Sequence, residues 1–275
     1  MKVKDYFLTK EDFEIAKCGQ CGLLFTEPRP NPNEIGKYYQ SQDYYSHQQN
    51  KKGFIPKIYE KVKSINVRNK VAMAIEGLQE GKLLDIGCGV GDFLAEIKKN
   101  KWDIMGIEPS DEAKAIAKTR IGFTPLDPSE TTTLQDHSFD VITMWHVLEH
   151  VEDLKKQLEE LHRLLKPEGR LIIAIPNYCA YDCEYYKDKW AAWDVPRHLN
   201  HFSPECLESI IKAQGFNTID RKKLIWDAYY ISFLSEKYLG HSMPLLRGVW
   251  IGFRSNAKAR KKGMYSSLVY RFKKQ

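Results

Sequence analysis

Apolar and polar positions follow two alternating patterns along the middle of the chain. From residue 82 onward, short apolar runs alternate with longer segments whose apolar residues recur every three or four positions. Short runs are typical of buried strands, and the longer spacing is typical of the helices that cover them. The clearest helical stripe is stopped by residues 166–169. Its leucines are Leu154, Leu158, Leu161 and Leu165.

This order predicts an α/β fold with a parallel sheet covered on both faces, whose ligand lies at the carboxyl ends of the strands. We expect a Rossmann-like, seven-stranded sheet in a domain over 53–275, led in by helical segments over 55–78. A helix over 204–214 and an inserted helical pair at about 228–262 precede the last strand. The predicted strands are 83–86, 103–107, 123–126, 140–145, 170–175, 217–225 and 266–272, with helices at 92–100, 111–119 and 152–165.

Charge adds one asymmetry to this picture. The 275 residues carry 42 basic and 36 acidic side chains, a net charge of +6. Residues 254–275 hold eight of the basic ones and no acidic one, so the rest of the chain has 34 against 36. A nucleic-acid binder usually spreads basic residues over a folded face, so we interpret this segment as a solvated tail and do not expect a nucleic-acid partner.

Targeting signals are not evident in the sequence. No run approaches the roughly 20 apolar residues that a membrane-spanning helix needs, and charged residues interrupt the first twenty positions, which leaves no apolar core for a signal peptide. We therefore expect a cytoplasmic location without a membrane span.

A glycine-rich turn follows the first strand of the alternating region. It reads Asp85-Ile-Gly87-Cys-Gly89-Val-Gly91-Asp92, and glycines allow close backbone approach to a ligand at a helix N-terminus. A dinucleotide-binding turn, G-x-G-x-x-G, would carry its third glycine one residue later, where Asp92 stands. Carboxylates disfavour a pyrophosphate, whereas they favour a cationic ligand.

Glu108 ends the second strand, 23 residues after Asp85. A carboxylate at that place can accept hydrogen bonds from both hydroxyls of a ribose. The alternative is a solvated loop residue, and the preceding glycine turn favours the ribose role.

Together these pieces resemble the class I S-adenosylmethionine-dependent methyltransferases over about residues 80–225. The other matching segments are 138–142, 146–150 and 164–169. The resemblance implies that the glycines line the methionine and sugar parts of S-adenosylmethionine, that Glu108 holds the ribose, and that Asp127 approaches the adenine. The expected cofactor-binding residues are Asp85, Gly87, Cys88, Gly89, Gly91, Glu108, Pro109, Asp127 and Trp145. We interpret Cys88 as a packing residue and not as a nucleophile.

Histidines follow the fourth and fifth strands, where a base for the acceptor would be needed. They are His146, His150, His198 and His201, and all four are candidate catalytic residues. The segment 190–202, with two tryptophans and Arg197, resembles a small-molecule branch related to quinone and sugar methyltransferases. In the alternative interpretation this segment is a structural loop, in which histidines satisfy backbone groups and Arg197 pairs with Asp194.

Residues 1–52 form a Cys- and Tyr-rich extension that predicts short strands and irregular structure. Cys18 and Cys21 make half of a zinc site, which needs four ligands when closed; Cys179 and Cys183 are the candidates to complete it. The extension is interpreted either as a partial zinc ribbon or as a lid, the alternative being packing. The lid residues would be Tyr38, Tyr39, Tyr44, Tyr45 and His47.

The leading hypothesis is a methyltransferase that acts on a small molecule through oxygen, nitrogen or carbon. Alternatives are a methyltransferase of protein or nucleic acid that docks through its basic segment, a non-catalytic S-adenosylmethionine-binding protein, and a dinucleotide oxidoreductase, which Asp92 disfavours. The apolar insert 228–262 could cap the pocket, form a homodimer surface or touch an anionic membrane. We favour capping or self-association over the membrane.

Overall fold

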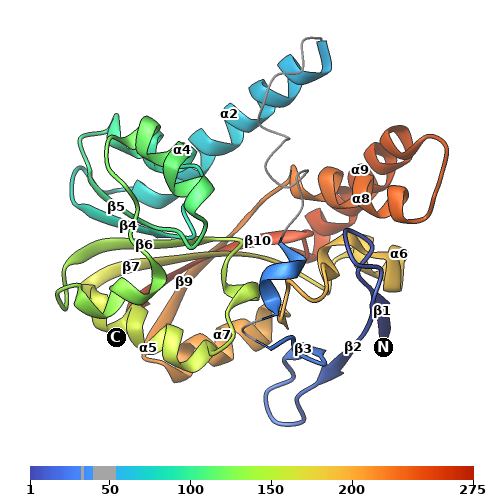
Figure 1. Cartoon of the computed structure of the whole chain (residues 1–275), viewed down its shortest axis with the longest axis horizontal. Coiled ribbons are helices and arrows are strands. Elements are labelled where there is room, and N and C mark those ends of the chain that lie inside the picture. Colours follow the sequence, from blue (N-terminus) through green and yellow to red (C-terminus); the bar gives the residue numbers. More distant parts are fainter. Residues whose placement is uncertain (32–33, 40–53) are drawn as a thin grey trace.

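The computed structural model describes residues 1–31, 34–39 and 54–275. Its centre is a six-stranded sheet in the order β5-β4-β6-β7-β10-β9, in which β10 runs antiparallel to both of its neighbours (Figure 1). This confirms the predicted α/β class with a Rossmann-like sheet. The strands are β4 (Lys82–Ile86), β5 (Asp103–Ile107), β6 (Phe139–Trp145), β7 (Leu165–Pro176), β9 (Phe216–Lys223) and β10 (Ser267–Lys274).

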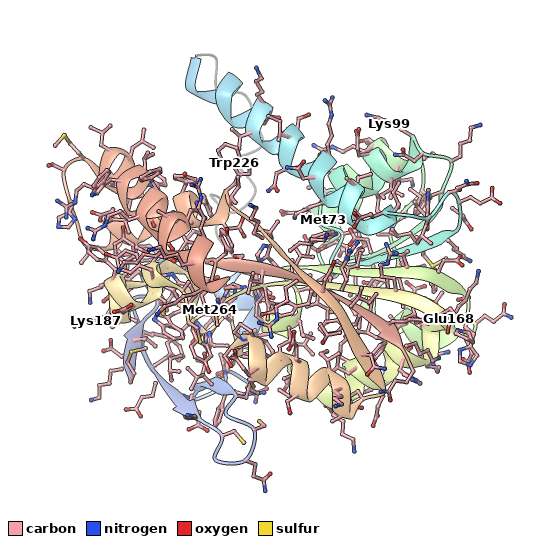
Figure 2. All side chains as sticks on the ribbon, turned by 180° about the vertical axis from the view of Figure 1, so that it is seen from behind. Met73, Lys99, Glu168, Lys187, Trp226 and Met264 are labelled. Atoms are coloured by element: carbon pink, nitrogen blue, oxygen red, sulfur yellow. The ribbon has the colours of Figure 1, made fainter. Side chains whose placement is uncertain are left out.

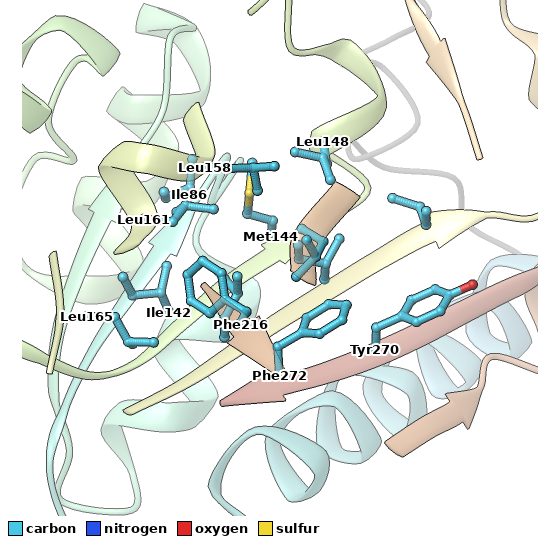
Figure 3. Close-up of a cluster of buried hydrophobic side chains, with 14 of the residues drawn as sticks. Ile86, Ile142, Met144, Leu148, Leu158, Leu161, Leu165, Phe216, Tyr270 and Phe272 are labelled. Atoms are coloured by element: carbon cyan, nitrogen blue, oxygen red, sulfur yellow. The ribbon is translucent and has the colours of Figure 1, made fainter. Parts of the chain in front are cut away.

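Helices cover both faces of this sheet because neighbouring strand residues point to opposite sides. Leu83 faces one cluster of buried side chains with α2, α3 and α4, whereas Leu84 faces another with α5 and α7. Figure 3 shows the second cluster, in which Leu158 and Leu161 of α5 pack onto the sheet. These helices are α2 (Phe54–Ile75), α3 (Asp92–Lys98), α4 (Asp111–Ile121), α5 (Leu154–Leu164) and α7 (Pro204–Ala213).

The predicted third strand, 123–126, is not a strand of the described structure, so the count of seven was wrong. Only Leu126 pairs, in a single parallel bridge with Ile107. Pro125 and Pro128 flank this position, and a proline has no N–H to donate to a neighbouring strand. Leu126 nevertheless brings the following residue to the carboxyl edge of the sheet. The short helix η2 (Pro128–Thr133) follows it.

The N-terminal extension forms a smaller, antiparallel sheet that includes a strand from the large domain. Its order is β1-β2-β3-β8. The buried guanidinium of Arg197 ties the two parts together, since Nη2 donates to Asp5 Oδ1 at 3.0 Å and to Asp194 Oδ1 at 2.6 Å. The strands are β1 (Lys2–Lys4), β2 (Asp12–Lys17), β3 (Leu24–Glu27) and β8 (Asn200–His201), and a short helix η1 (Ile35–Tyr38) follows β3.

The remaining helices gather beside the extension. The inserted pair is α8 (Asp227–Tyr238) and α9 (Pro244–Lys262), which form a hairpin at the edge of the molecule (Figure 1). No helix in the described ranges is long and apolar enough to cross a bilayer. Before β8 lie α6 (Tyr181–Tyr186), η4 (Lys187–Lys189) and η5 (Ala191–Trp193), and η3 (Leu148–His150) follows β6.

Candidate active site

The glycine turn joins β4 to α3 as the sequence predicts. Gly87 has a φ of +70°, and a Cβ placed there would lie 2.4 Å from Val147 Cγ2, so a larger residue would collide with the segment after β6. The backbone N–H groups of Gly87 and Cys88 both donate to Ile107 O, at 2.8 and 3.0 Å. The turn is thereby fixed against the end of β5, and Gly91 caps the N-terminus of α3.

Two carboxylates lie beneath and beside this turn. Asp85 is 2% exposed and accepts a hydrogen bond from Thr143 Oγ1 at 2.6 Å. Burial raises the pKa of Asp85 to about 7, although Thr143 and Lys70 act in the opposite direction. Glu108 accepts hydrogen bonds from the N–H of Gly89 at 2.8 Å and of Ser110 at 3.0 Å. Burial also raises the pKa of Glu108. The carboxylate of Glu108 therefore links the glycine turn to the start of α4.

The other predicted cofactor residues lie along the same edge of the sheet. Asp127 follows the Leu126 bridge, and its Oδ1 accepts a hydrogen bond from Lys114 Nζ at 2.7 Å. Trp145 ends β6, and its buried Nε1 has no hydrogen-bond partner among the described residues. Cys88 is buried, which raises the pKa of its thiol, whereas Pro109 is exposed. We call the glycine turn with Glu108, Asp127 and Trp145 the donor site.

Lys70 is a residue at this site that sequence reasoning missed. Its Nζ lies 4.8 Å from the centre of the Trp145 ring. Burial lowers the pKa of Lys70, although the carboxylates of Asp227 and Asp85 act to raise it. Lys70 sits on α2 and Asp227 begins α8, far apart in sequence. No local motif connects them, so a single sequence gives no signal for this contact.

His146 stands between the donor site and the remaining histidines. Its φ of +60° turns the chain directly after β6. Its Nε2 lies 3.1 Å from Asp227 Oδ2, and its Nδ1 lies 3.4 Å from Glu149 Oε1. Burial would lower the pKa of His146, but these two carboxylates raise it to about 9. A carboxylate beside each ring nitrogen thus favours the protonated imidazolium, a form in which His146 would not act as a base.

His150 and His198 lie together beyond it, with ring centres 4.6 Å apart. Their Nδ1 atoms lie 2.9 Å from the carbonyl oxygens of Arg197 and Ala192 respectively. A carbonyl only accepts, so each Nδ1 carries a proton, and in a neutral imidazole Nε2 then has the lone pair. Burial and the neighbouring His198 lower the pKa of His150 to about 4. Tyr39 also contacts His150, through its hydroxyl at 3.1 Å.

His201 is held differently. Thr26 Oγ1 donates to His198 O at 2.7 Å and lies 3.0 Å from His201 Nε2, so His201 Nε2 must donate to Thr26. Burial lowers the pKa of His201 well below its ordinary value. The Thr26 contact crosses between β3 and β8, which is a structural role of the kind the alternative interpretation gave to this loop. Arg197 likewise pairs with Asp194.

Glu149 is the least satisfied group of this region. It is 1% exposed, and although Oε1 lies 3.4 Å from His146 Nδ1, neither carboxylate oxygen accepts a hydrogen bond of regular geometry from the described residues. A small cavity with room for about one water molecule lies beside it, lined also by Trp190, His198 and His201. One ligand atom each of Glu149, His150 and His198 lie within 4.8 Å of one another, so these three could hold a metal ion. We call Glu149, His150, His198 and His201 the histidine cluster.

The predicted zinc ligands do not form such a group. Cys18 and Cys21 lie in a turn in which Gly22 N donates to Cys18 O at 3.1 Å. Backbone N–H groups of Cys21 and Gln20 lower the pKa of Cys18, and the thiol next to the pair is Cys206. No set of three metal-ligand atoms within 4.8 Å includes Cys18 or Cys21 in the described part of the chain. Of the predicted lid, Tyr44, Tyr45 and His47 lie outside the described residues.

A family model described as a methyltransferase domain matches residues 60–220, more than half of the chain. The chain belongs to this family. That result confirms the resemblance drawn from the sequence motifs. The part of this methyltransferase domain that the model matches holds the donor site and the whole histidine cluster. It leaves Tyr39, Asp227 and the Cys18–Cys21 pair outside.

Individual relatives cover less of the chain. The bovine mitochondrial ubiquinone biosynthesis O-methyltransferase is 30% identical over 152 residues, which are 50% of this chain and 41% of that protein. The human protein of the same name is 29% identical over 173 residues, 55% of this chain and 47% of its own. The methyltransferase domain thus spans less than half the length of these two relatives.

Solved structures agree with the fold. A methyltransferase of Thermotoga maritima, described as S-adenosylmethionine-dependent, has a TM-score of 0.52 at 22% identity and covers 80% of this chain and 96% of its own. The 1,6-didemethyltoxoflavin N1-methyltransferase of Burkholderia thailandensis has a TM-score of 0.55 at 15% identity, with 99% of both chains covered. At these identities the likeness shows the shared fold.

Proposed function

We propose that this methyltransferase domain transfers the methyl group of S-adenosylmethionine to a small-molecule acceptor. The observation that carries the proposal is the pair of buried carboxylates at the glycine turn. Asp85 lies beneath the turn, and Glu108 accepts hydrogen bonds from its backbone. Burial raises the pKa of both carboxyls, so a ligand with sulfonium and ammonium groups would favour their ionised form, whereas a pyrophosphate would oppose it.

The donor site also offers unused hydrogen-bonding capacity to such a ligand. Each oxygen of the Glu108 carboxylate accepts one backbone N–H, and a carboxylate oxygen can accept a second hydrogen bond. The ribose hydroxyls are suitable donors. The buried Nε1–H of Trp145 has no acceptor among the described residues, so it can donate to a polar atom of the ligand. These residues fit an uncharged sugar with a cationic side chain.

When bound, S-adenosylmethionine supplies a methyl carbon that is already activated by its sulfonium, so the protein has to position an acceptor and remove a proton. His198 and His150 are our candidates for the base. Their Nδ1–H groups are anchored on backbone carbonyls, which orients each ring and leaves Nε2 free to accept a proton. The buried carboxylate of Glu149 lies close enough to stabilise the imidazolium that forms.

The small-molecule part of the proposal is supported by the similar proteins, which are named as methyltransferases of ubiquinone biosynthesis and of a toxoflavin precursor. Whether oxygen, nitrogen or carbon receives the methyl group follows from the acceptor.

Calorimetric titration tests the donor half of the proposal. We expect S-adenosylmethionine and S-adenosylhomocysteine to bind at micromolar levels, roughly the range typical of enzyme ligands, and NAD not to bind. A screen of small phenols, amines and sugars for release of S-adenosylhomocysteine tests the acceptor half. Binding of NAD in preference to S-adenosylmethionine would overturn the proposal. Release of S-adenosylhomocysteine only when a protein or nucleic acid is added would mean that the acceptor is a macromolecule and not a small molecule.

A further inference from the structure

Helix α9 has two unlike faces, and only one of them is packed. Small residues on one face allow close contact with α8: a Cβ placed at Gly248 would lie 2.6 Å from the Phe233 Cα, and one at Gly252 would lie 2.8 Å from the Tyr229 Cα. Ser255 and Ala259 continue this buried face along the helix. The backbones of α8 and α9 are therefore in direct contact, and the hairpin is a fixed part of the fold.

The opposite face is apolar and exposed. Its side chains are between 48% and 66% exposed, and they occur at the spacing of one helical stripe. The rings of Trp250 and Phe253 stack on each other, with centres 6.2 Å apart. We call this set the α9 stripe. It consists of Leu245, Leu246, Val249, Trp250 and Phe253.

The α9 stripe lies on the outer face of the α8–α9 hairpin. The stripe points away from α8 and from the buried residues that join the hairpin to the domain. Figure 1 shows α9 at the periphery, and Figure 2 shows it from behind, on the side of the molecule away from Lys99. A contiguous exposed apolar surface of this kind on a folded helix marks an interaction site.

Charge around the stripe identifies its partner. No Asp or Glu occurs between residue 237 and the end of the sequence. The exposed cations toward the end of α9 form no ion pair with any described carboxylate; they are Arg254, Lys258, Arg260, Lys261 and Lys262. A second copy joined through its stripe would offer these cations no acidic residue of its own α9, so they would remain without a carboxylate partner at that interface. An anionic partner would instead be attracted to them.

We propose that α9 lies on the surface of an anionic lipid bilayer, with the stripe inserted among the headgroups and acyl chains and the basic end on the lipid phosphates. A helix with exposed Trp, Phe and Leu beside Lys and Arg residues that form no ion pair with a described carboxylate has the composition of an interfacial helix. Electrostatic attraction to anionic lipid then adds to the burial of the apolar side chains. This proposal is independent of the methyl-transfer reaction.

Flotation with vesicles tests it on the full chain. We expect binding to phosphatidylcholine vesicles that contain about one quarter phosphatidylglycerol, weaker binding as NaCl rises from about 0.1 to about 0.5 M, and little binding to pure phosphatidylcholine. The substitutions W250S/F253S should reduce partitioning at least about tenfold by removing inserted apolar area. R260Q/K261Q/K262Q should reduce it about tenfold by removing charge.

A matched control separates local from global charge. K99Q/K101Q/K118Q removes three exposed cations elsewhere on the molecule and should leave partitioning nearly unchanged. Circular dichroism melts confirm that each variant is folded. Equal binding to neutral and anionic vesicles would overturn the proposal. A concentration-dependent dimer that W250S/F253S abolishes, with no vesicle binding, would overturn it and identify a second copy as the occupant.

Discussion

The residues that define the donor site come from one stretch of chain, 85–145, whereas the histidine cluster joins residues 149–150 to 198–201 and is contacted by the N-terminal extension. At the donor site, backbone N–H groups form the hydrogen bonds that fix the glycine turn and Glu108, where strand ends and helix starts meet at one edge of the sheet. In the histidine cluster, His150 of η3 contacts Tyr39 of the extension, and His201 of β8 contacts Thr26. The first arrangement is encoded locally and the second depends on tertiary contacts.

The largest expected effect concerns the donor site. Gly87→Ala places a Cβ at a positive φ and against Val147, so we expect a loss of about 3 kcal/mol in the free energy of unfolding, from backbone strain and overpacking combined. Gly89→Ala is the matched control, because φ is also positive there but nothing lies within 4 Å of the added Cβ; its cost should be about 1 kcal/mol. Urea unfolding measures both.

A double variant sharpens this test. Val147→Ala removes the atoms that collide with the new methyl group, so Gly87→Ala in that background should cost only as much as Gly89→Ala. Equal costs for the two single variants would show that the β6–η3 segment does not press on the glycine turn.

The next effect concerns the histidine cluster. His198→Ala and His150→Ala should each lower turnover about 100-fold, the range for loss of a general base, with little change in affinity for S-adenosylmethionine. His201→Ala should affect stability more than turnover, because its Nε2 is engaged with Thr26. Steady-state assays of S-adenosylhomocysteine release measure turnover, and calorimetry measures affinity. Full turnover in both the His198 and His150 variants would remove these residues from the reaction.

The pH dependence of stability tests the residue that connects the two regions. Because the pKa of His146 is raised from 6.5 to about 9, its pairing with Asp227 and Glu149 stabilises the fold fully below pH 6.5 and ceases to do so as the pH rises through 9. Asparagine adopts a positive φ readily, so His146→Asn removes the ion pairs without added backbone strain. We expect it to lower the free energy of unfolding by roughly 2 kcal/mol near pH 6, after allowance for solvent screening, and by almost nothing near pH 9.5. Urea midpoints at the two pH values give the comparison. A cost that does not change with pH would mean that His146 is neutral in the folded protein.

The same contrast explains what the sequence could predict. Apolar periodicity and the spacing Asp85–Gly91 to Glu108 locate the strands, the turn and the carboxylate, because these depend on residues close together in the chain. The apolar pattern predicted a strand at 123–126, but the prolines on either side of Leu126 limit pairing to that one residue. A hydrophobic pattern does not include this effect of proline. The contacts His146–Asp227 and His201–Thr26 join residues 81 and 175 positions apart, and no periodic signal spans such distances. The zinc pair shows the same limit, since only the fold places Cys206 beside Cys21.

The smallest effect returns to the donor site. In Glu108→Gln the remaining side-chain oxygen can accept a hydrogen bond from only one of the two backbone N–H groups, that of Gly89 or that of Ser110, and the new NH₂ group faces the second N–H. A neutral amide oxygen is also a weaker acceptor for a ribose hydroxyl than a carboxylate oxygen. We expect about a tenfold loss of affinity for S-adenosylmethionine in calorimetry, close to the strength of one charge-assisted hydrogen bond. Glu112→Gln, on the exposed first turn of α4, is the control and should bind normally. Unchanged affinity in Glu108→Gln would mean that this carboxylate only braces the turn, and the ribose would have to be held by side chains from the acceptor side.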